Sequence, residues 1–234
     1  MKKLLYLIVF LSVAMTLSWS TIFPKHPIGV PLGRTPLAAQ VSAQSTPLEE
    51  IVLLPIEPFE EDEVLKIVGR LNTLPMNLLQ RLKNEEIQIR LFQDKLTDFP
   101  STAHLKDVIP RGYESDDITW DEVPGIGGSK LVLVKIGHSD PGQGHGSSNL
   151  ELHELAHTIQ RYLLNDFYLE ITLLDLWETE SELLFPGKSY FISYKEEFFA
   201  EAFAMYYLNE STRKTLYKRA PQTYAFFLQL EKMY

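Results

Sequence analysis

The chain has 234 residues, 45% of them hydrophobic and 12% aromatic, so it can bury a full core and we expect a single folded domain. It contains no cysteine, which excludes disulfides, thiolate metal ligands and cysteine nucleophiles, so any metal must be held by histidine nitrogen and carboxylate oxygen. The formal net charge of -9 at pH 7 offers no broad basic surface, and we expect no nucleic-acid partner.

Residues 1–20 have the pattern of a secretory signal peptide. Two lysines precede a mostly apolar run over residues 4–17, and Ser18 and Ser20 supply small residues of the kind a signal peptidase recognises. The alternative is an uncleaved anchor, because the apolar run is close to the shortest length that spans a bilayer. We therefore expect a secreted, extracellular protein with no stable membrane partner beyond possible anchoring by this leader.

Residues 21–48 are rich in Pro, Ala, Ser and Gln and show no sustained period, which indicates a linker or pro-segment. The folded domain is expected over residues 49–234. Its first part is expected to contain short strands and short helices. Apolar runs predict strands over residues 51–55, 87–92 and 131–136, the second with one face in water because its apolar residues alternate. Helical spacing of apolar residues predicts helices over residues 60–71 and 76–82.

The second half of the chain is predicted to be mainly helical. A glycine-rich loop over residues 137–148 leads into the strongest helical pattern, which Ser148 or Asn149 can cap and which continues to about residue 165. Further helices are predicted over residues 194–208, 210–219 and 221–234. A small N-terminal sheet with helices, followed by a mainly helical half, predicts an α+β fold.

The strongest helix carries the sequence HELAH at residues 153–157. Side chains four apart on a helix lie about 6 Å from each other at Cβ, so His153 and His157 can bind one zinc ion. Glu154 is turned one position round the helix and can face a water molecule at the open side of the metal, where it would act as general base. The alternative is two structural histidines, but the long amphipathic helix and the glycine-rich loop before it favour a metal site beside a cleft.

A catalytic zinc needs a third protein ligand and one open position. No further histidine follows His157 at ligand spacing, so the third ligand must come from another element. The apolar helix that contains KEEFFAEAF offers Glu197 and Glu201, four residues apart on one face. Buried carboxylates need partners, and a metal or the N–H of a ligand histidine would provide them. Salt-bridged or solvent-reaching glutamates are the alternative, and spacing alone does not choose between the two residues.

HELAH followed some forty residues later by EEFFAEAFAMYY resembles the catalytic domain of anthrax lethal factor and its relatives, and most closely the small secreted Pro-Pro endopeptidases. The segments TWDEVPG, GHSDPGQGHGSSNL and APQTYAFF extend the resemblance over roughly residues 110–234. It implies a zincin-like single domain in which two helices flank one Zn²⁺ per chain. It also implies a zinc metalloendopeptidase acting on extended, proline-rich (Pro-Pro) segments of surface or extracellular proteins. We expect this protein to be a monomer.

The resemblance also assigns individual roles. It makes Glu197 the third zinc ligand and leaves Glu201 to hold a ligand histidine. Seven residues before Glu197, Tyr190 corresponds to a catalytic tyrosine that donates a hydrogen bond to the oxyanion, although its local sequence indicates only a loop aromatic. Trp120 corresponds to a residue that lines the substrate cleft, with core packing as the alternative, and Glu196 is expected at the cleft rim.

Two other functions fit the same motifs. One is a lethal-factor-like peptidase with a different specificity, and the other is a secreted module that binds zinc or a peptide without turnover. The presence of both Glu154 and Tyr190 argues against the second, because a binding module needs neither a base nor an oxyanion donor. His138 and His145, in the glycine-rich loop, are expected to be exposed and are not needed as ligands.

Overall fold

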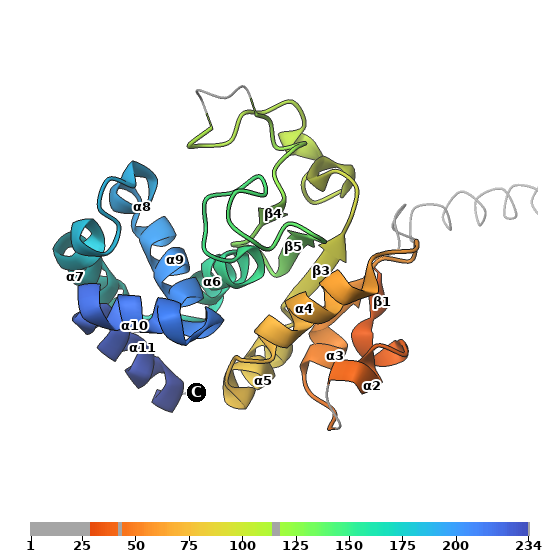
Figure 1. Ribbon diagram of the computed structural model, residues 1–234, viewed down its shortest axis with the longest axis horizontal. Coiled ribbons are helices and arrows are strands. Elements are labelled where there is room, and N and C mark those ends of the chain that lie inside the picture. The colour runs from red at the N-terminus through yellow and green to blue at the C-terminus, as the bar shows by residue number, and fades with distance from the viewer. Residues whose placement is uncertain (1–28, 42–43, 114–117, 234) are drawn as a thin grey trace, which may run out of the picture.

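The computed structural model describes residues 29–41, 44–113 and 118–233, and five strands of this part of the chain form one sheet beside a group of helices (Figure 1). The strands are β1 (Val30–Pro31), β2 (Val52–Leu54), β3 (Gln88–Phe92), β4 (Gly125–Ile126) and β5 (Leu131–Lys135). Their order is β1-β2-β3-β5-β4, with β2, β3 and β5 parallel and the two edge strands antiparallel. The predicted α+β class is confirmed.

The central strand β3 is more deeply buried than its alternating sequence predicts. From Ile89 to Phe92 every side chain is buried, including Arg90 at 8% exposure. The guanidinium carbon of Arg90 lies 5.1 Å from the centroid of the Phe99 ring, which covers the face that was expected to meet water. The prediction of one wet face is therefore wrong, because the segment that follows β3 folds back over it.

Order begins well before the domain boundary expected at residue 49. Val30 pairs with Leu54 across β1 and β2, and Leu32 and Leu37 are buried in the main core. The elements here are a 3-10 turn at Leu32–Arg34, α2 (Ala38–Val41) and α3 (Leu48–Ile51). Residues 29–41 and 44–48 of the expected linker thus belong to the fold. The leader expected at residues 1–20 lies outside the described residues.

Two amphipathic helices complete the N-terminal half, α4 (Glu61–Leu71) and α5 (Met76–Asn84), close to where spacing predicts them. In α4 the acidic residues of the first turn and Arg70 in the last turn both complement the helix dipole. Its buried residues are Val64, Ile67, Val68 and Leu71. They recur at the spacing of one helical face, and that face packs into the core.

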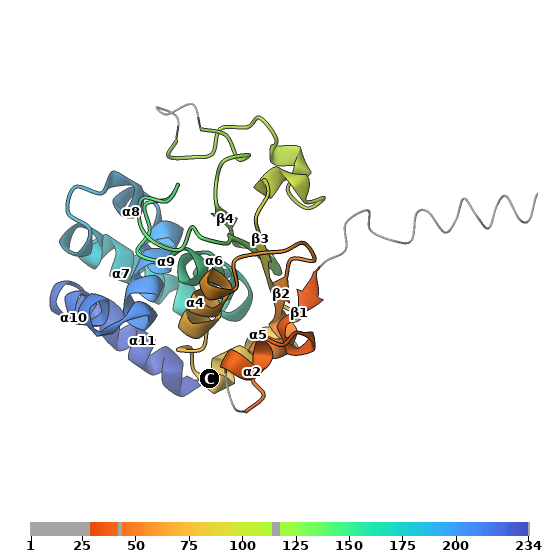
Figure 2. The ribbon, with the colours of Figure 1, turned by 45° about the vertical axis from the view of Figure 1, so that its right-hand side comes forward.

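The C-terminal half is helical, as predicted. Its helices are α6 (Leu150–Leu163), α7 (Phe167–Leu184), α8 (Ser189–Ser193), α9 (Lys195–Leu208), α10 (Glu210–Arg219) and α11 (Pro221–Met233). Helix α6 lies between the sheet and α9 and packs against both (Figures 1 and 2). Every side chain of α9 from Glu197 to Tyr207 is buried, which explains its apolar sequence. No helix among the described residues has the length and apolar content needed to cross a membrane.

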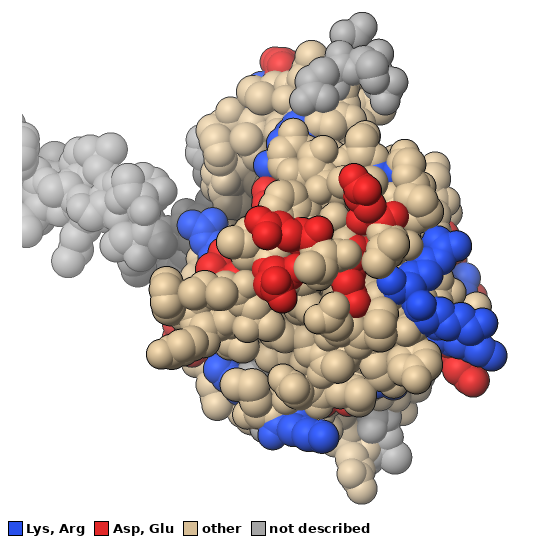
Figure 3. All heavy atoms as spheres, turned by 90° about the vertical axis from the view of Figure 1, so that its left-hand side faces the viewer, with Lys and Arg blue, Asp and Glu red and all other residues tan. Residues whose placement is uncertain are grey.

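Helix α7, which the sequence did not predict, carries carboxylates in two different environments. Its outer side exposes Glu170, Asp175, Glu178 and Glu182, and acidic groups gather on this face of the molecule (Figure 3). Glu180 instead is 2% exposed and accepts hydrogen bonds from the backbone amides of Gln222 (2.9 Å) and Thr223 (2.8 Å) and from the Thr223 hydroxyl (2.7 Å). It therefore caps the N-terminus of α11 from a neighbouring helix.

We expect Glu180→Ala to lower the free energy of unfolding by about 1–3 kcal/mol, because the amides at the start of α11 would be buried without an acceptor. Urea denaturation measures this change. Glu182→Ala is the matched control, since it removes an exposed carboxylate from the same helix. Equal stability of the two variants would contradict the capping role.

Candidate active site

Helix α6 presents both histidines of the HELAH segment on one face. Its N-terminus is capped by Asn149, whose side chain accepts a hydrogen bond from the Leu152 amide at 3.0 Å, as the sequence allowed. The Nε2 atoms of His153 and His157 lie 3.2 Å apart, with the two rings 83° from parallel. The two imidazoles therefore converge on one point.

A carboxylate from α9 reaches the same point. Oε2 of Glu197 lies 3.2 Å from Nε2 of His153 and 3.6 Å from Nε2 of His157. Ligand atoms that surround a tetrahedral zinc at about 2.0–2.2 Å are roughly 3.3 Å from each other. The three atoms therefore have the separations of ligands that share one ion, and two nitrogens with one oxygen are a donor set that suits a divalent metal.

The electrostatics of this group favour a positive charge. Burial would lower the pKa of His153, but Glu197 and Glu201 outweigh it and raise that pKa to about 10. Burial would raise the pKa of Glu197, but its bonds to His153 and His157 hold that pKa well below its ordinary value. Such a site stabilises a cation at the point where the three side chains meet.

The two glutamates of α9 meet different atoms of His153. Glu197 faces Nε2, whereas Oε2 of Glu201 lies 3.4 Å from Nδ1 on the opposite side of the ring. Glu201 also accepts hydrogen bonds from the backbone amide of Ser148 (2.9 Å) and from its hydroxyl, so it ties the glycine-rich loop to α9. Spacing along α9 did not say which of the two glutamates could be the third ligand. In the structure Glu197 lies on the side of the His153 ring that faces the candidate metal position, and Glu201 lies on the opposite side.

Glu154 lies beside the histidines and against the edge strand β4. Burial, its largest influence, raises the pKa of Glu154 above its ordinary value. A Cβ atom added to Gly127 would lie 1.9 Å from the Glu154 carbonyl oxygen, and one added to Gly125 would lie 2.9 Å from its Cγ. Glycine is therefore required for β4 and the residue after it to approach the helix this closely, which places an edge strand next to the half-buried carboxyl group of Glu154.

Tyr190 lies on α8 and points to the same centre. Its hydroxyl donates a hydrogen bond to Oε1 of Glu197 at 2.9 Å. Burial, and then the charge of Glu197, raise the pKa of Tyr190, so its phenol keeps its proton and remains a donor at neutral pH. Sequence spacing alone gave no reason to place this side chain here.

These groups line a cleft of about 1420 Å³. Trp120 lines it too and also packs against the small cluster of Phe92, Leu96 and Leu133, so the lining and packing roles expected for this residue coexist. Glu196 lies at the cleft with its side chain 42% exposed. In the view of Figure 1, α8 and the described part of the connection from β3 to β4, which carries Trp120, both lie above α6.

One residue at the cleft was not anticipated. Arg111, in the loop before β4, places an NH2 nitrogen 3.1 Å from Oε1 of Glu197 and 2.9 Å from Oε1 of Glu196. An arginine separated from its partners by more than eighty residues leaves no local pattern in the sequence, so only the tertiary fold could reveal it.

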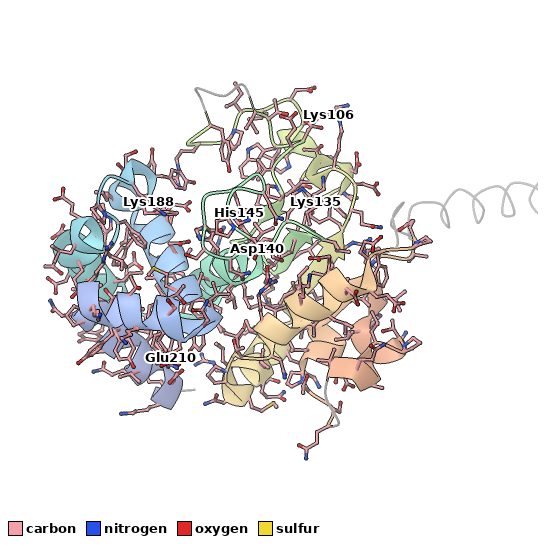
Figure 4. All side chains as sticks on the ribbon, in the orientation of Figure 1. Lys106, Lys135, Asp140, His145, Lys188 and Glu210 are labelled. Carbon is pink, nitrogen blue, oxygen red and sulfur yellow. The ribbon has the colours of Figure 1, made fainter. Side chains whose placement is uncertain are left out.

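The glycine-rich loop runs above α6 and carries His145 (Figure 4). His145 is half-buried rather than exposed: Nδ1 lies 2.7 Å from the Ser147 hydroxyl and Nε2 lies 2.8 Å from the His138 carbonyl. His138 is also half-buried, with Nδ1 3.1 Å from the carbonyl of Ile136. The expectation that both are exposed is wrong, because both rings hold the loop in shape.

The chain is similar to known proteins over most of its length. The family model described as anthrax toxin lethal factor, N- and C-terminal domain, matches residues 40–230. A Pro-Pro endopeptidase of Clostridioides difficile (strain 630) is 39% identical over 203 residues, which cover 87% of this chain and 91% of that protein. A Pro-Pro endopeptidase of Paenibacillus alvei is 35% identical over 200 residues, 86% of this chain and 90% of that protein.

A solved structure agrees with these matches. The structure of the Pro-Pro endopeptidase from Paenibacillus alvei superposes with a TM-score of 0.74 at 35% identity, and the match covers 79% of this chain and 100% of that one. The similarity therefore extends from sequence to fold over the part of the chain that contains the cleft.

Proposed function

The chain belongs to the anthrax toxin lethal factor family, and from this membership and the geometry of the cleft we propose that it is a zinc-dependent metalloendopeptidase that cleaves between prolines in extended protein segments. The observation that carries the proposal is the meeting of Nε2 of His153, Nε2 of His157 and Oε2 of Glu197 within 3.6 Å of one another. These three residues would hold one zinc ion, and the bound ion would polarise the carbonyl of the bond to be cleaved.

Glu154 is the proposed general base. Its raised pKa brings the carboxylate closer to the range in which it can both take and return a proton. It takes the proton of the attacking water and delivers it to the leaving nitrogen. In a Pro-Pro bond that nitrogen carries no hydrogen of its own, so it must gain a proton before it departs as the ring amine of the second proline.

Tyr190 is the proposed oxyanion donor. As water adds to the scissile carbonyl, negative charge develops on the carbonyl oxygen, and a protonated phenol can stabilise it with a hydrogen bond. Its hydroxyl already donates to Glu197 at 2.9 Å and needs only to turn toward the substrate. Because the pKa of Tyr190 is raised, the donor is available throughout the neutral range.

The substrate follows from two features of the cleft. Strand β4 forms an edge of the sheet and lines the cleft, so an extended peptide can lie along it. Proline lacks a backbone N–H and cannot form every bond of an added strand, but its ring can stack on a flat aromatic side chain. Trp120 supports a preference for proline because its side chain is partly exposed at the same cleft, where a proline ring could stack on it.

The proposal extends to where the protein acts and in which oligomeric state. We propose that the protein is exported by its leader and acts as a monomer on surface or extracellular proteins. The composition of residues 1–20 supports export. The lack of cysteine leaves the fold independent of disulfide formation, so it tolerates either redox environment.

Incubating the purified protein with a peptide library that contains Pro-Pro at varied positions tests the proposal. We expect cleavage between the two prolines, its loss after dialysis against a chelator, and its recovery on addition of zinc; mass spectrometry identifies the cleaved bonds and the bound metal. Cleavage confined to sites without proline would indicate another specificity. A zinc-loaded protein that cleaves nothing would indicate a binding module instead.

A further inference from the structure

Arg111 connects the two walls of the cleft. It lies in the loop between the 3-10 turn at Ala103–Leu105 and β4, and its guanidinium group reaches α9 on the other side. The guanidinium carbon lies 3.8 Å from the centroid of the Tyr194 ring, at the start of α9. Stacking on an aromatic ring fixes the plane of a guanidinium group, so its N–H bonds can be directed.

The two oxygens of Glu197 have different partners. Oε2 faces the two histidines, whereas Oε1 accepts one hydrogen bond from Tyr190 at 2.9 Å and one from Arg111 at 3.1 Å. The Glu197 side chain is 8% exposed, so solvent does little to satisfy Oε1. A buried carboxylate oxygen that loses its protein partners costs free energy and tends to rotate toward new ones.

This arrangement matters when Tyr190 acts. If its hydroxyl turns to the substrate carbonyl, Oε1 of Glu197 loses one of its two donors. Arg111 is then the donor that remains, and its charge-assisted bond keeps the carboxylate in the same rotamer. Without Arg111, Tyr190 would have to leave a buried oxygen unpaired in order to reach the substrate.

We propose that Arg111 is a positioning residue, which holds Oε1 of Glu197 so that Oε2 stays directed at the histidines while Tyr190 is used by the substrate. The inference rests on the proposed peptidase function. It differs from a plain ion pair at the cleft rim, where the contact with the half-exposed Glu196 at 2.9 Å would be worth little.

Arg111→Met in the full chain separates these roles, because methionine keeps an apolar side chain over Tyr194 but donates no hydrogen bond. We expect the dissociation constant for zinc, measured by competition with a coloured chelator and without substrate, to rise about 10- to 100-fold, because the neutral Tyr190 hydroxyl alone holds Oε1 of Glu197 less firmly than a charge-assisted bond does. We also expect kcat on a Pro-Pro peptide to fall by about the same factor, with KM unchanged within about threefold. Arg111→Lys should recover part of both losses, since an ammonium can donate to Oε1 of Glu197 but cannot stack on Tyr194 as a planar guanidinium does.

Arg219→Met is the matched control, since it removes an exposed arginine from the end of α10, and it should behave as the wild type in both assays. Zinc affinity and kcat that stay at wild-type values in Arg111→Met would overturn the inference, as would a rise in KM alone. If Arg111→Met folds poorly by circular dichroism, Arg111→Lys decides: a partial loss in both assays would support the inference, and wild-type values in both would overturn it. Failure of the wild type to cleave any peptide would count against the proposed function, while the zinc assay would still decide the role of Arg111.

Discussion

Glu154→Gln is expected to lower kcat on a Pro-Pro peptide about 100- to 10,000-fold, the range that a positioned general base contributes. Glutamine has nearly the same shape as glutamate, so the variant keeps the close approach of Gly125 and Gly127 to residue 154. It cannot take a proton from water, and the step that generates the nucleophile is lost. Because Glu154 is not among the three side chains that meet at the candidate metal position, the variant should bind zinc as the wild type does.

Steady-state kinetics and metal analysis of the same sample measure both parts of this prediction. Glu182→Gln serves as a control, because it makes the same chemical change at an exposed position of α7. A Glu154→Gln enzyme that keeps more than a tenth of wild-type kcat would assign the base to another group. Loss of zinc together with loss of turnover would mean that the substitution damaged the site and not only the proton transfer.

The elements that the sequence predicts well are those whose pattern is long and periodic. Helix α6 has a polar cap and an apolar face, and strand β5 has three consecutive buried apolar residues at its centre. Helix α7 has apolar residues on all its sides, Phe167 exposed and Leu176 buried, so no clean face marks it. Strand β4 is two residues long, and its pairing with β5, rather than its composition, makes it a strand.

The same contrast holds for the site. His153 and His157 are predictable because both lie on one helix four residues apart, and local geometry brings their rings together. Glu197 and Glu201 share a face of α9 just as regularly, and which of them meets Nε2 depends on how α9 is placed along α6. Local spacing contains no such information; resemblance to a family supplied the choice. Arg111 had neither a local pattern nor a family motif to indicate it.

Tyr190→Phe is expected to lower kcat about 100- to 1,000-fold, the usual effect of removing one oxyanion donor, with KM nearly unchanged. The substitution removes one oxygen and keeps the ring, which packs beside Phe191 and Tyr194. Its effect on zinc affinity should be smaller than that of Arg111→Met. Arg111 still holds Oε1 of Glu197 with a charge-assisted bond in the Tyr190→Phe protein, whereas Arg111→Met leaves only the neutral and weaker hydrogen bond of the phenol.

Comparing kcat with the zinc dissociation constant in the two variants separates transition-state stabilisation from ligand positioning. Tyr168→Phe, at a side chain 78% exposed on α7, is the control for loss of a phenol elsewhere. If Tyr190→Phe weakened zinc binding as much as it slowed turnover, Tyr190 would act on the metal ligand and not on the substrate. If it changed neither, the developing charge must be stabilised by some other donor. An isolated fall in kcat is the result that fits a phenol placed 2.9 Å from Glu197 and free to turn toward the peptide.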